Sequence, residues 1–201
     1  TRAKEHREMT RQKYGFRDEH VVIGKIARLF HLKGHQDLIT AAIPVLQRQP
    51  NVRFLLVGDG ILRETLTQRI AELGLSDHFV FAGLVPPTEV PALIGGMDAL
   101  VHASYREGLA RALPQALIAG LPVISYDVDG AREVAITGQT GILVPAQDVA
   151  ALSQALETLA VDDPMRQRMG REGQRRFPEQ FDHRTMTARV REVYQQQLED
   201  G

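Results

Sequence analysis

The fold of this chain is decided by one stretch, Phe54-Leu55-Leu56-Val57-Gly58-Asp59-Gly60. Four consecutive apolar residues that run into a glycine turn are typical of a strand buried on both faces of a sheet. A helical stripe follows directly, made by Leu62, Leu66, Ile70 and Leu73 and closed by Gly74. A buried strand, a tight turn and an amphipathic helix in succession indicate one unit of an α/β fold.

The same unit recurs on both sides of this stretch. Buried strands are predicted within residues 20–24, 54–57, 78–81, 99–102, 122–125 and 141–144. Helices are predicted within residues 38–46, 62–73, 91–94, 112–119, 149–159, 165–177 and 186–198. This alternation predicts a Rossmann-like three-layer αβα sandwich with a six-stranded parallel sheet. Ligands of such sheets bind at the carboxyl ends of the strands, so the loops that follow the strands are where a site is expected.

Composition narrows the class of protein. The chain has 201 residues, of which 43% are hydrophobic, enough for a buried core. Its 24 basic and 25 acidic residues give a net charge of -1, which argues against a nucleic-acid binder. Cysteine is absent, which excludes disulfides, cysteine-ligated zinc and thiol catalysis. No apolar stretch approaches the ~20 residues that span a bilayer, and the charged start is unlike a signal peptide, so we expect a cytoplasmic protein.

Three segments are predicted along the chain. Residues 1–19 are expected to form an interdomain linker or helix, residues 20–180 the ligand-binding domain, and residues 181–201 a C-terminal helix. Within the first segment, residues 1–14 are expected to lie on the surface, outside the core. A basic stretch in the second half could touch anionic lipids, as a peripheral contact at the inner membrane face. It comprises Arg166, Arg168, Arg171, Arg175 and Arg176. Interspersed acids, namely Glu172, Glu179 and Asp182, favour a solvated helix face instead.

The loop after the first strand carries two cations. Arg28 and Lys33 lie in it, and Gly34 opens the next helix. A helix start flanked by cations is a natural phosphate site, although two solvated surface charges are the commoner arrangement. His31 and His35 have metal-ligand spacing, but Gly34 lies between them and no acidic third ligand is near in sequence, so we predict no metal site.

The turn Gly58-Asp59-Gly60 does not complete a dinucleotide fingerprint, because Arg63 occupies the position of the last glycine. There is no Walker A loop either. By itself this turn is interpreted as a structural connection.

The loop after the fourth strand is the most informative. Glu107 is predicted at the mouth of the next helix, and the N–H groups of Gly108, Leu109 and Ala110 in its first turn could bind an anion. Gln115 follows eight positions after Glu107, on about the same helical face. A helix-capping role for Glu107 is an equally good interpretation at this point.

The loop after the fifth strand repeats the pattern. Asp127, Asp129, Gly130 and Glu133 follow that strand, with the glycine ahead of a short helix. Capping of that helix by the acids is the simpler interpretation.

Together these loops resemble the retaining glycosyltransferases of the GT-B fold, the large group often called family 4. The resemblance runs from about Val21 to Leu198 and rests on pieces in a fixed order. They are Ala27-Arg28-Leu29 with Lys33-Gly34, Val57-Gly58-Asp59-Gly60, Phe81-Ala82-Gly83, Glu107-Gly108-Leu109, Ala119-Gly120-Leu121-Pro122-Val123-Ile124, Gly130 with Glu133, and Gly141-Ile142-Leu143-Val144.

The resemblance implies a role for each loop. Arg28 and Lys33 would hold the diphosphate of a nucleoside-diphosphate sugar, which is a substrate, without a metal or other cofactor. Glu107, the catalytic candidate, would contact hydroxyls of the transferred sugar. The backbone of Gly108, Leu109 and Ala110 would lie against sugar and phosphate, and that of Gly83, Leu84 and Val85 against the nucleobase.

Two positions depart from the family pattern. Gln115 stands where the family has a second acid that accepts hydrogen bonds from both ribose hydroxyls; an amide has one oxygen acceptor, so we predict an altered ribose contact. Ala110 replaces a usual glycine and narrows the approach of the backbone to a ligand.

The resemblance covers one half of a GT-B fold, the carboxyl-terminal, donor-binding half. We therefore expect the chain to bind a UDP- or GDP-sugar but to transfer little sugar alone, because the acceptor glycan or lipid-linked sugar would bind an amino-terminal domain. The last helix often packs on that domain, so residues 182–198 are expected to expose apolar surface. A sugar-nucleotide epimerase of the same fold and a degenerate interaction domain, for which Gln115 is the sequence hint, stay open as alternatives.

Overall fold

The computed structural model describes residues 2–178, 180–181 and 183–199. Within them, six parallel strands form one sheet in the order β3-β2-β1-β4-β5-β6. The strands are β1 (Val21–Ile26), β2 (Val52–Val57), β3 (Phe79–Gly83), β4 (Ala99–His102), β5 (Val123–Tyr126) and β6 (Gly141–Val144). Each begins and ends within two residues of the predicted strand, which confirms the α/β prediction.

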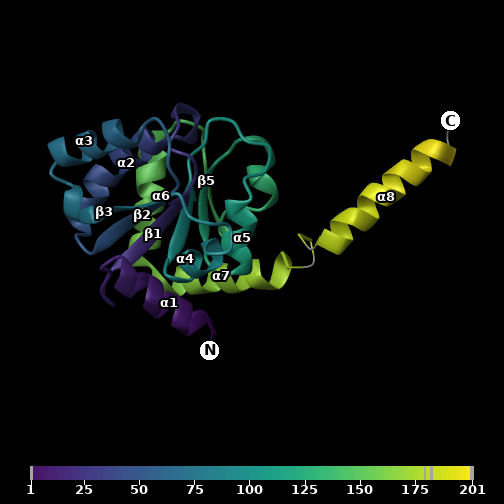
Figure 1. Cartoon of the computed structure of the whole chain (residues 1–201), viewed down its shortest axis with the longest axis horizontal. Coiled ribbons are helices and arrows are strands. Elements are labelled where there is room, and N and C mark those ends of the chain that lie inside the picture. Colours follow the sequence, from purple (N-terminus) through teal and green to yellow (C-terminus); the bar gives the residue numbers. More distant parts are fainter. Residues whose placement is uncertain (1, 179, 182, 200–201) are drawn as a thin grey trace.

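Helices cover both faces of the sheet (Figure 1). One face is covered by α2 (His35–Arg48), α3 (Arg63–Glu72) and α6 (Val149–Val161), the other by α4 (Val90–Gly95) and α5 (Ala112–Ile118), with α7 (Asp163–Arg176) beside α5. Successive strand residues point to opposite faces. Phe54 and Leu56 therefore pack in the core with α2 and α3, while Leu55 and Val57 pack in the core with α4 and α5.

Short 3₁₀ turns join some of these elements: η1 (His31–Lys33), η2 (Ser76–His78) and η3 (Asp129–Glu133). They lie in loops that the sequence left without regular structure, apart from η3. Gln49 and Pro50 end α2 as predicted, although Pro44 is accommodated inside that helix.

Helix α1 (Arg2–Lys13) corrects the expectation that residues 1–14 lie outside the core. Thr10 and Arg11 are buried, at 3% and 4% exposure, where α1 packs against α4. Arg7 and Arg11 donate to opposite oxygens of Asp98, each at 2.8 Å, and Asp98 also accepts from the N–H of Val22 at 2.7 Å. The helix is therefore fastened to the amino-terminal edge of the sheet, away from the predicted site. Its part as a connection to another domain stays a prediction.

Helix α8 (His183–Glu199) extends away from the sheet and its covering helices (Figure 1). Val190, Tyr194 and Leu198 follow one another at a spacing of four and are 51%, 68% and 83% exposed. This is the exposed apolar surface expected of the last helix. Glu179 and Asp182 lie outside the described residues. None of the helices in the described part of the chain has the length and apolarity needed to cross a bilayer.

The order of the strands decides where a ligand can bind. From β1 the chain moves outward through β2 to β3, and then returns to the other side of β1 for β4, β5 and β6. The loops after β1 and β4 consequently leave the sheet in opposite directions and open a crevice at the carboxyl ends of these two strands.

Candidate functional site

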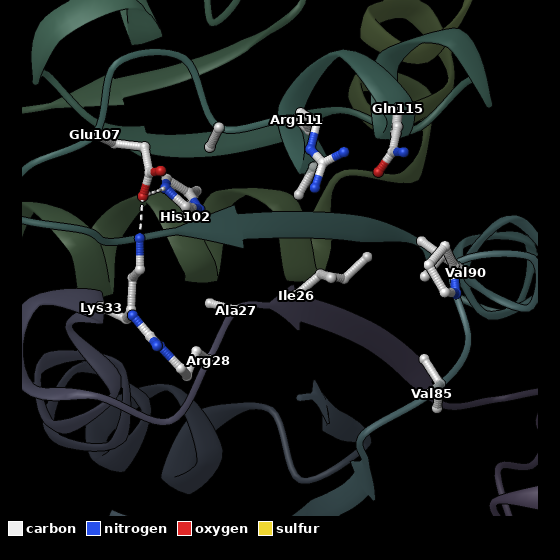
Figure 2. A pocket seen from close by; sticks show the side chains of 13 residues that line it. Ile26, Ala27, Arg28, Lys33, Val85, Val90, His102, Glu107, Arg111 and Gln115 are labelled. Atoms are coloured by element: carbon white, nitrogen blue, oxygen red, sulfur yellow. Dashed lines mark hydrogen bonds and ion pairs between the residues drawn. The ribbon is translucent and has the colours of Figure 1, made fainter. Parts of the chain in front are cut away.

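A cavity of about 320 Å³ occupies this crevice (Figure 2). It is lined from the β1 side, from the loop after β4, from α5 and from the segment after β3. Its lining residues are Ile26, Ala27, Arg28, Lys33, Val85, Pro87, Val90, His102, Glu107, Ala110, Arg111, Ala112 and Gln115. The structure thus brings together Arg28, Lys33, Glu107, Ala110, Gln115 and Val85 from the predicted site.

Lys33 and Glu107 form an ion pair inside the cavity. The ammonium of Lys33 donates to Oε2 of Glu107, and the two side chains are 22% and 27% exposed. An ion pair screened from water in this way is stronger than one on an open surface. Lys33 is therefore no solvated surface charge, and this alternative is wrong for it.

The backbone fixes the position of Lys33 against β4. Gly34 has a φ of 62°, a left-handed conformation that glycine adopts most readily, and a Cβ there would lie 1.9 Å from the carbonyl oxygen of Ala103. The N–H of Tyr105 donates to the carbonyl of Leu32 at 2.9 Å. These close approaches hold the loop after β1 and the loop after β4 in one arrangement.

Glu107 does not cap a helix. Helix α5 begins at Ala112, so Glu107 lies in an extended loop and Gly108, Leu109 and Ala110 precede the helix instead of forming its first turn. This corrects both predictions for this segment. Among the described residues, nothing accepts from the N–H groups of these three residues, and of the three only Ala110 lines the cavity.

A second loop holds Glu107 in place. Oδ2 of Asp129 accepts from the backbone N–H of Glu107 at 2.8 Å, and the N–H of Gly130 donates to the carbonyl of Gly108 at 2.8 Å. Asp129 has a φ of 44°, which is unusual for a residue with a side chain. The capping interpretation of Asp129 is wrong: its side chain fastens the neighbouring loop, and η3 has no side-chain cap. Asp127 pairs with Arg132 at 2.8 Å, and Glu133 is the last residue of η3, so it does not cap the start of that turn.

Arg28 lies on the same side of the cavity as Lys33 (Figure 2). Its guanidinium lies over the ring of Phe30, 5.3 Å from the ring centre, which restrains an otherwise exposed side chain. The turn at Gly58 supports this loop from below, since the carbonyl of Asp59 accepts from the N–H of Leu29 at 3.0 Å. The turn is structural in this respect, and Gly58 and Asp59 also line a hollow that adjoins the cavity.

Helix α5 adds a residue that sequence reasoning missed. Arg111 and Gln115 lie one turn apart and point into the cavity from the side opposite Ile26 (Figure 2). Arg111 brings the cationic side chains of the lining to three, against one carboxylate. Its position between the predicted Ala110 and Gln115 was the available signal.

The residues that follow β3 line both the cavity and a second hollow next to it. A second hollow of about 260 Å³ continues from the first past Ile26, Ala27 and Arg28, and Leu84 and Val85 line it. Leu84 is 84% exposed there. Gly83 lies behind this lining, where its carbonyl accepts from the N–H of Gly58 at 2.9 Å.

A group of buried polar side chains lies behind Lys33 and Glu107, and sequence reasoning missed it too. Lys25 in β1, His35 at the start of α2, His102 at the end of β4 and Ser104 are at most 3% exposed. Their side-chain nitrogens and the hydroxyl find no hydrogen-bond partner among the described residues. The signal was a histidine inside one predicted apolar strand and a lysine directly after another.

Burial lowers the pKa of each ionisable side chain in this group. Burial, and then the nearby cation of Lys33, lower the pKa of Lys25 to about 7. Burial and then the cation of Lys25 lower the pKa of His35 to about 2 and that of His102 to about 3. Both imidazoles are therefore neutral near pH 7. His31 is exposed in η1 and does not join them, and no three metal-ligating side chains gather anywhere in the described residues.

Asp37 links the segments behind the site by hydrogen bonds. Its two carboxylate oxygens accept from the hydroxyls of Tyr105 and Tyr126, at 2.9 and 2.7 Å. Burial and the hydrogen bond to Asp37 raise the pKa of Tyr105 to about 12, and the same causes raise the pKa of Tyr126 further. Both hydroxyls stay protonated and tie α2, the loop after β4 and β5 together.

This sheet order and the cavity at its switch point define the Rossmann-like half of a GT-B fold. Its lining carries three cationic side chains and one carboxylate. The chain belongs to the glycosyl transferases group 1, a family whose pattern matches residues 6–176.

The chain is similar in sequence to several curated glycosyltransferases. It is 36% identical to the 2-deoxystreptamine N-acetyl-D-glucosaminyltransferase of Streptomyces fradiae over 143 residues, 70% of this chain and 34% of that protein. It is 32% identical to the GDP-mannose-dependent alpha-(1-6)-phosphatidylinositol monomannoside mannosyltransferase of Mycolicibacterium smegmatis over 191 residues, 91% of this chain and 50% of that protein. The chain thus spans half or less of these relatives.

A solved structure shows the same architecture. The Anabaena protein HepE, crystallised with UDP and glucose, superposes with a TM-score of 0.85 at 27% identity, over 95% of this chain and 52% of that one.

Proposed function

We propose that this chain is the donor-binding domain of a retaining glycosyltransferase that takes a nucleoside-diphosphate sugar, UDP- or GDP-linked. The observation that carries the proposal is the Lys33–Glu107 pair with Arg28 beside it, in a cavity at the switch point of the sheet. Cations suit a diphosphate and the carboxylate suits sugar hydroxyls, so the two chemistries of such a donor meet at adjacent side chains.

Each end of the donor has a place in this proposal. Arg28 and Lys33 bind the diphosphate, with Arg111 as a third cation facing them from α5. The free N–H groups of Gly108, Leu109 and Ala110 lie against sugar and phosphate, and the hollow at Leu84 and Val85 takes the nucleobase. The ligands named for two similar proteins support the class of donor: GDP-mannose for the mycobacterial enzyme and UDP with glucose for HepE.

The cations also serve the reaction. When the bond between the anomeric carbon and the diphosphate oxygen breaks, negative charge develops on the departing nucleoside diphosphate. Arg28, Lys33 and Arg111 stabilise that charge in place, which lowers the barrier without a metal ion. Glu107 accepts hydrogen bonds from the transferred sugar and fixes its orientation.

The acceptor, a glycan or a lipid-linked sugar, belongs to a second domain in this proposal, since the chain spans 34% and 50% of the two relatives. The chain alone is therefore expected to bind donor and to transfer little or no sugar. Rapid transfer to a defined acceptor by the 201-residue chain would contradict this part.

Titration calorimetry with UDP, GDP and ADP tests the donor site. Micromolar to submillimolar binding of one nucleotide, weakened in Lys33→Ala, supports the proposal. Absence of binding at millimolar concentration would overturn it and favour the degenerate interaction domain. Product analysis with the longer protein separates a transferase from an epimerase. A transferase releases free nucleotide and forms a transferred sugar, whereas an epimerase yields an isomerised sugar.

A further inference from the structure

His102 stands out among the residues that line the cavity. It is 3% exposed at the carboxyl end of β4, and neither ring nitrogen has a hydrogen-bond partner among the described residues. Burying a polar group without a partner is unfavourable, so such groups are rare in folded proteins. A cavity-lining histidine of this kind indicates a partner that is engaged in another state of the site.

The nearest candidate partner is Glu107. Nε2 of His102 lies 3.7 Å from Oε2 of Glu107, beyond a hydrogen bond but less than 1 Å from one (Figure 2). In the present arrangement this same oxygen accepts from the ammonium of Lys33. Lys33 and His102 therefore lie near the same carboxylate oxygen of Glu107, and Lys33 is the one that donates to it.

A donor changes this balance. The diphosphate competes for the ammonium of Lys33, and the partly buried carboxylate of Glu107 would then lose part of its charge compensation. A neutral imidazole can supply an N–H in its place. The groups that face His102 are the cations of Lys25 and Lys33, the neutral His35 and the carboxylate of Glu107, and the two cations are part of what keeps the ring neutral.

We infer that His102 is a positioning residue: when a donor's diphosphate engages Lys33, the Nε2–H of His102 donates to Glu107 and aims the other carboxylate oxygen at the sugar. The inference rests on the proposed function for the role of the donor. The exchange of partners is a property of the three side chains alone, however, and can be provoked without any donor.

The variant Lys33→Ala provides that test in the 201-residue chain. Histidine ¹⁵N–¹H spectra of the wild type and of Lys33→Ala are recorded without ligand, with His102→Gln used to assign the His102 signals. Removal of Lys33 is expected to shift the His102 Nε2–H signal downfield and to protect it from exchange. Adding Glu107→Ala to Lys33→Ala should abolish both effects, and His20, at the other end of β1, should not respond.

A binding measurement tests the role in recognition. The ratio of the affinity for the nucleoside-diphosphate sugar to that for the nucleoside diphosphate is expected to fall about tenfold in His102→Ala. His102→Gln, whose amide also donates, should retain the ratio within about threefold. His35→Gln is the matched control, a buried, unpartnered histidine outside the cavity lining, and should leave the ratio unchanged.

The outcomes separate the two proposals. An unchanged His102 signal in Lys33→Ala, or equal losses for nucleotide and nucleotide sugar in His102→Ala, overturns the positioning role. If the wild type binds no nucleotide, the proposed function fails, while the ligand-free spectra still decide the exchange of partners. Should His102→Ala fail to fold, the comparison of His102→Gln with the wild type and the spectra of Lys33→Ala carry the test.

Discussion

Lys33 and Glu107 are 74 positions apart in the sequence, yet their charged groups meet across the switch point of the sheet. One comes from the turn after β1 and the other from the loop after β4. The pair therefore joins the two halves of the sheet at the place where the proposed donor binds. A substitution at Lys33 or at Glu107 should therefore alter the binding of both the diphosphate and the sugar.

Lys33→Ala is expected to weaken nucleoside-diphosphate binding by about 1.5–3 kcal/mol, the contribution typical of a hydrogen bond to a charged group. Calorimetry against the nucleotide that the wild type binds gives the value. Lys4→Ala is the matched control, because Lys4 is 76% exposed on α1 and pairs with Glu8 at 3.7 Å. Unchanged affinity in Lys33→Ala would refute the diphosphate assignment.

Gln115→Glu is expected to strengthen discrimination between ribose and 2′-deoxyribose nucleotides by roughly three- to tenfold, because a carboxylate accepts two charge-assisted hydrogen bonds where the amide accepts with one oxygen. Affinities for UDP and 2′-deoxy-UDP, or for the GDP pair, are compared in both proteins. Gln36→Glu, at an exposed position in α2 outside the cavity, is the control. An equal gain in affinity for the ribose and the 2′-deoxyribose nucleotide would show that the new carboxylate does not contact the ribose 2′-hydroxyl.

Asp129→Ala is expected to lower the free energy of unfolding by about 1–2 kcal/mol, because it removes the acceptor for Glu107 N–H and leaves a residue with Cβ at a φ of 44°. It should also weaken binding of the sugar part of the donor. Asp129→Asn keeps an acceptor oxygen and tolerates this backbone conformation, so its urea unfolding should match the wild type within about 0.5 kcal/mol. Identical behaviour of the two variants would argue against the role of the side chain.

Lys25 makes stability depend on pH above neutrality. Burial and the cation of Lys33 lower the pKa of Lys25 in the folded state to about 7, whereas an unfolded chain restores a pKa near ~10.4. The unfolded state therefore binds more protons between these values, and the free energy of unfolding should rise with pH, by up to about 1.4 kcal/mol per unit.

Urea unfolding at pH 7, 8 and 9 measures this slope. Lys25→Met fills the same space without an amine and should remove it while stabilising the protein at pH 7. Lys4→Met, at an exposed position, should leave the slope as in the wild type. If the free energy of unfolding of Lys25→Met still rises with pH, another group causes the pH dependence.

The fold was predictable because each strand is a short apolar run with a glycine or proline near its end. The stretch at Phe54 alone carries a strand, a turn and a helix start, and its prediction is confirmed. The cations of the first loop were found for the same reason, since the end of a strand in a parallel sheet indicates which loops can face a ligand.

The start of α5 at Ala112 was predicted, but the residues just before it were expected to form a first helical turn, because nothing local distinguishes Gly108–Ala110 from the helix that follows. What holds these residues out of the helix is remote: Asp129 and Gly130 bind the backbone of Glu107 and Gly108 from another loop. His102 and Lys25 were missed for a different reason. His102 was included in an apolar strand and Lys25 in the loop after another strand, and their juxtaposition exists only once β1 and β4 are neighbours.

The projecting helix α8 has a consequence for how this chain melts. A 17-residue helix that projects from the sheet and its covering helices is marginal in water by itself. Ahead of α8, the ring of Phe181 lies 5.8 Å from the ring of the buried Phe177. The cooperative unit therefore ends near Phe181: on heating, the helical signal of α8 should fade gradually, ahead of the sharp transition of the sheet.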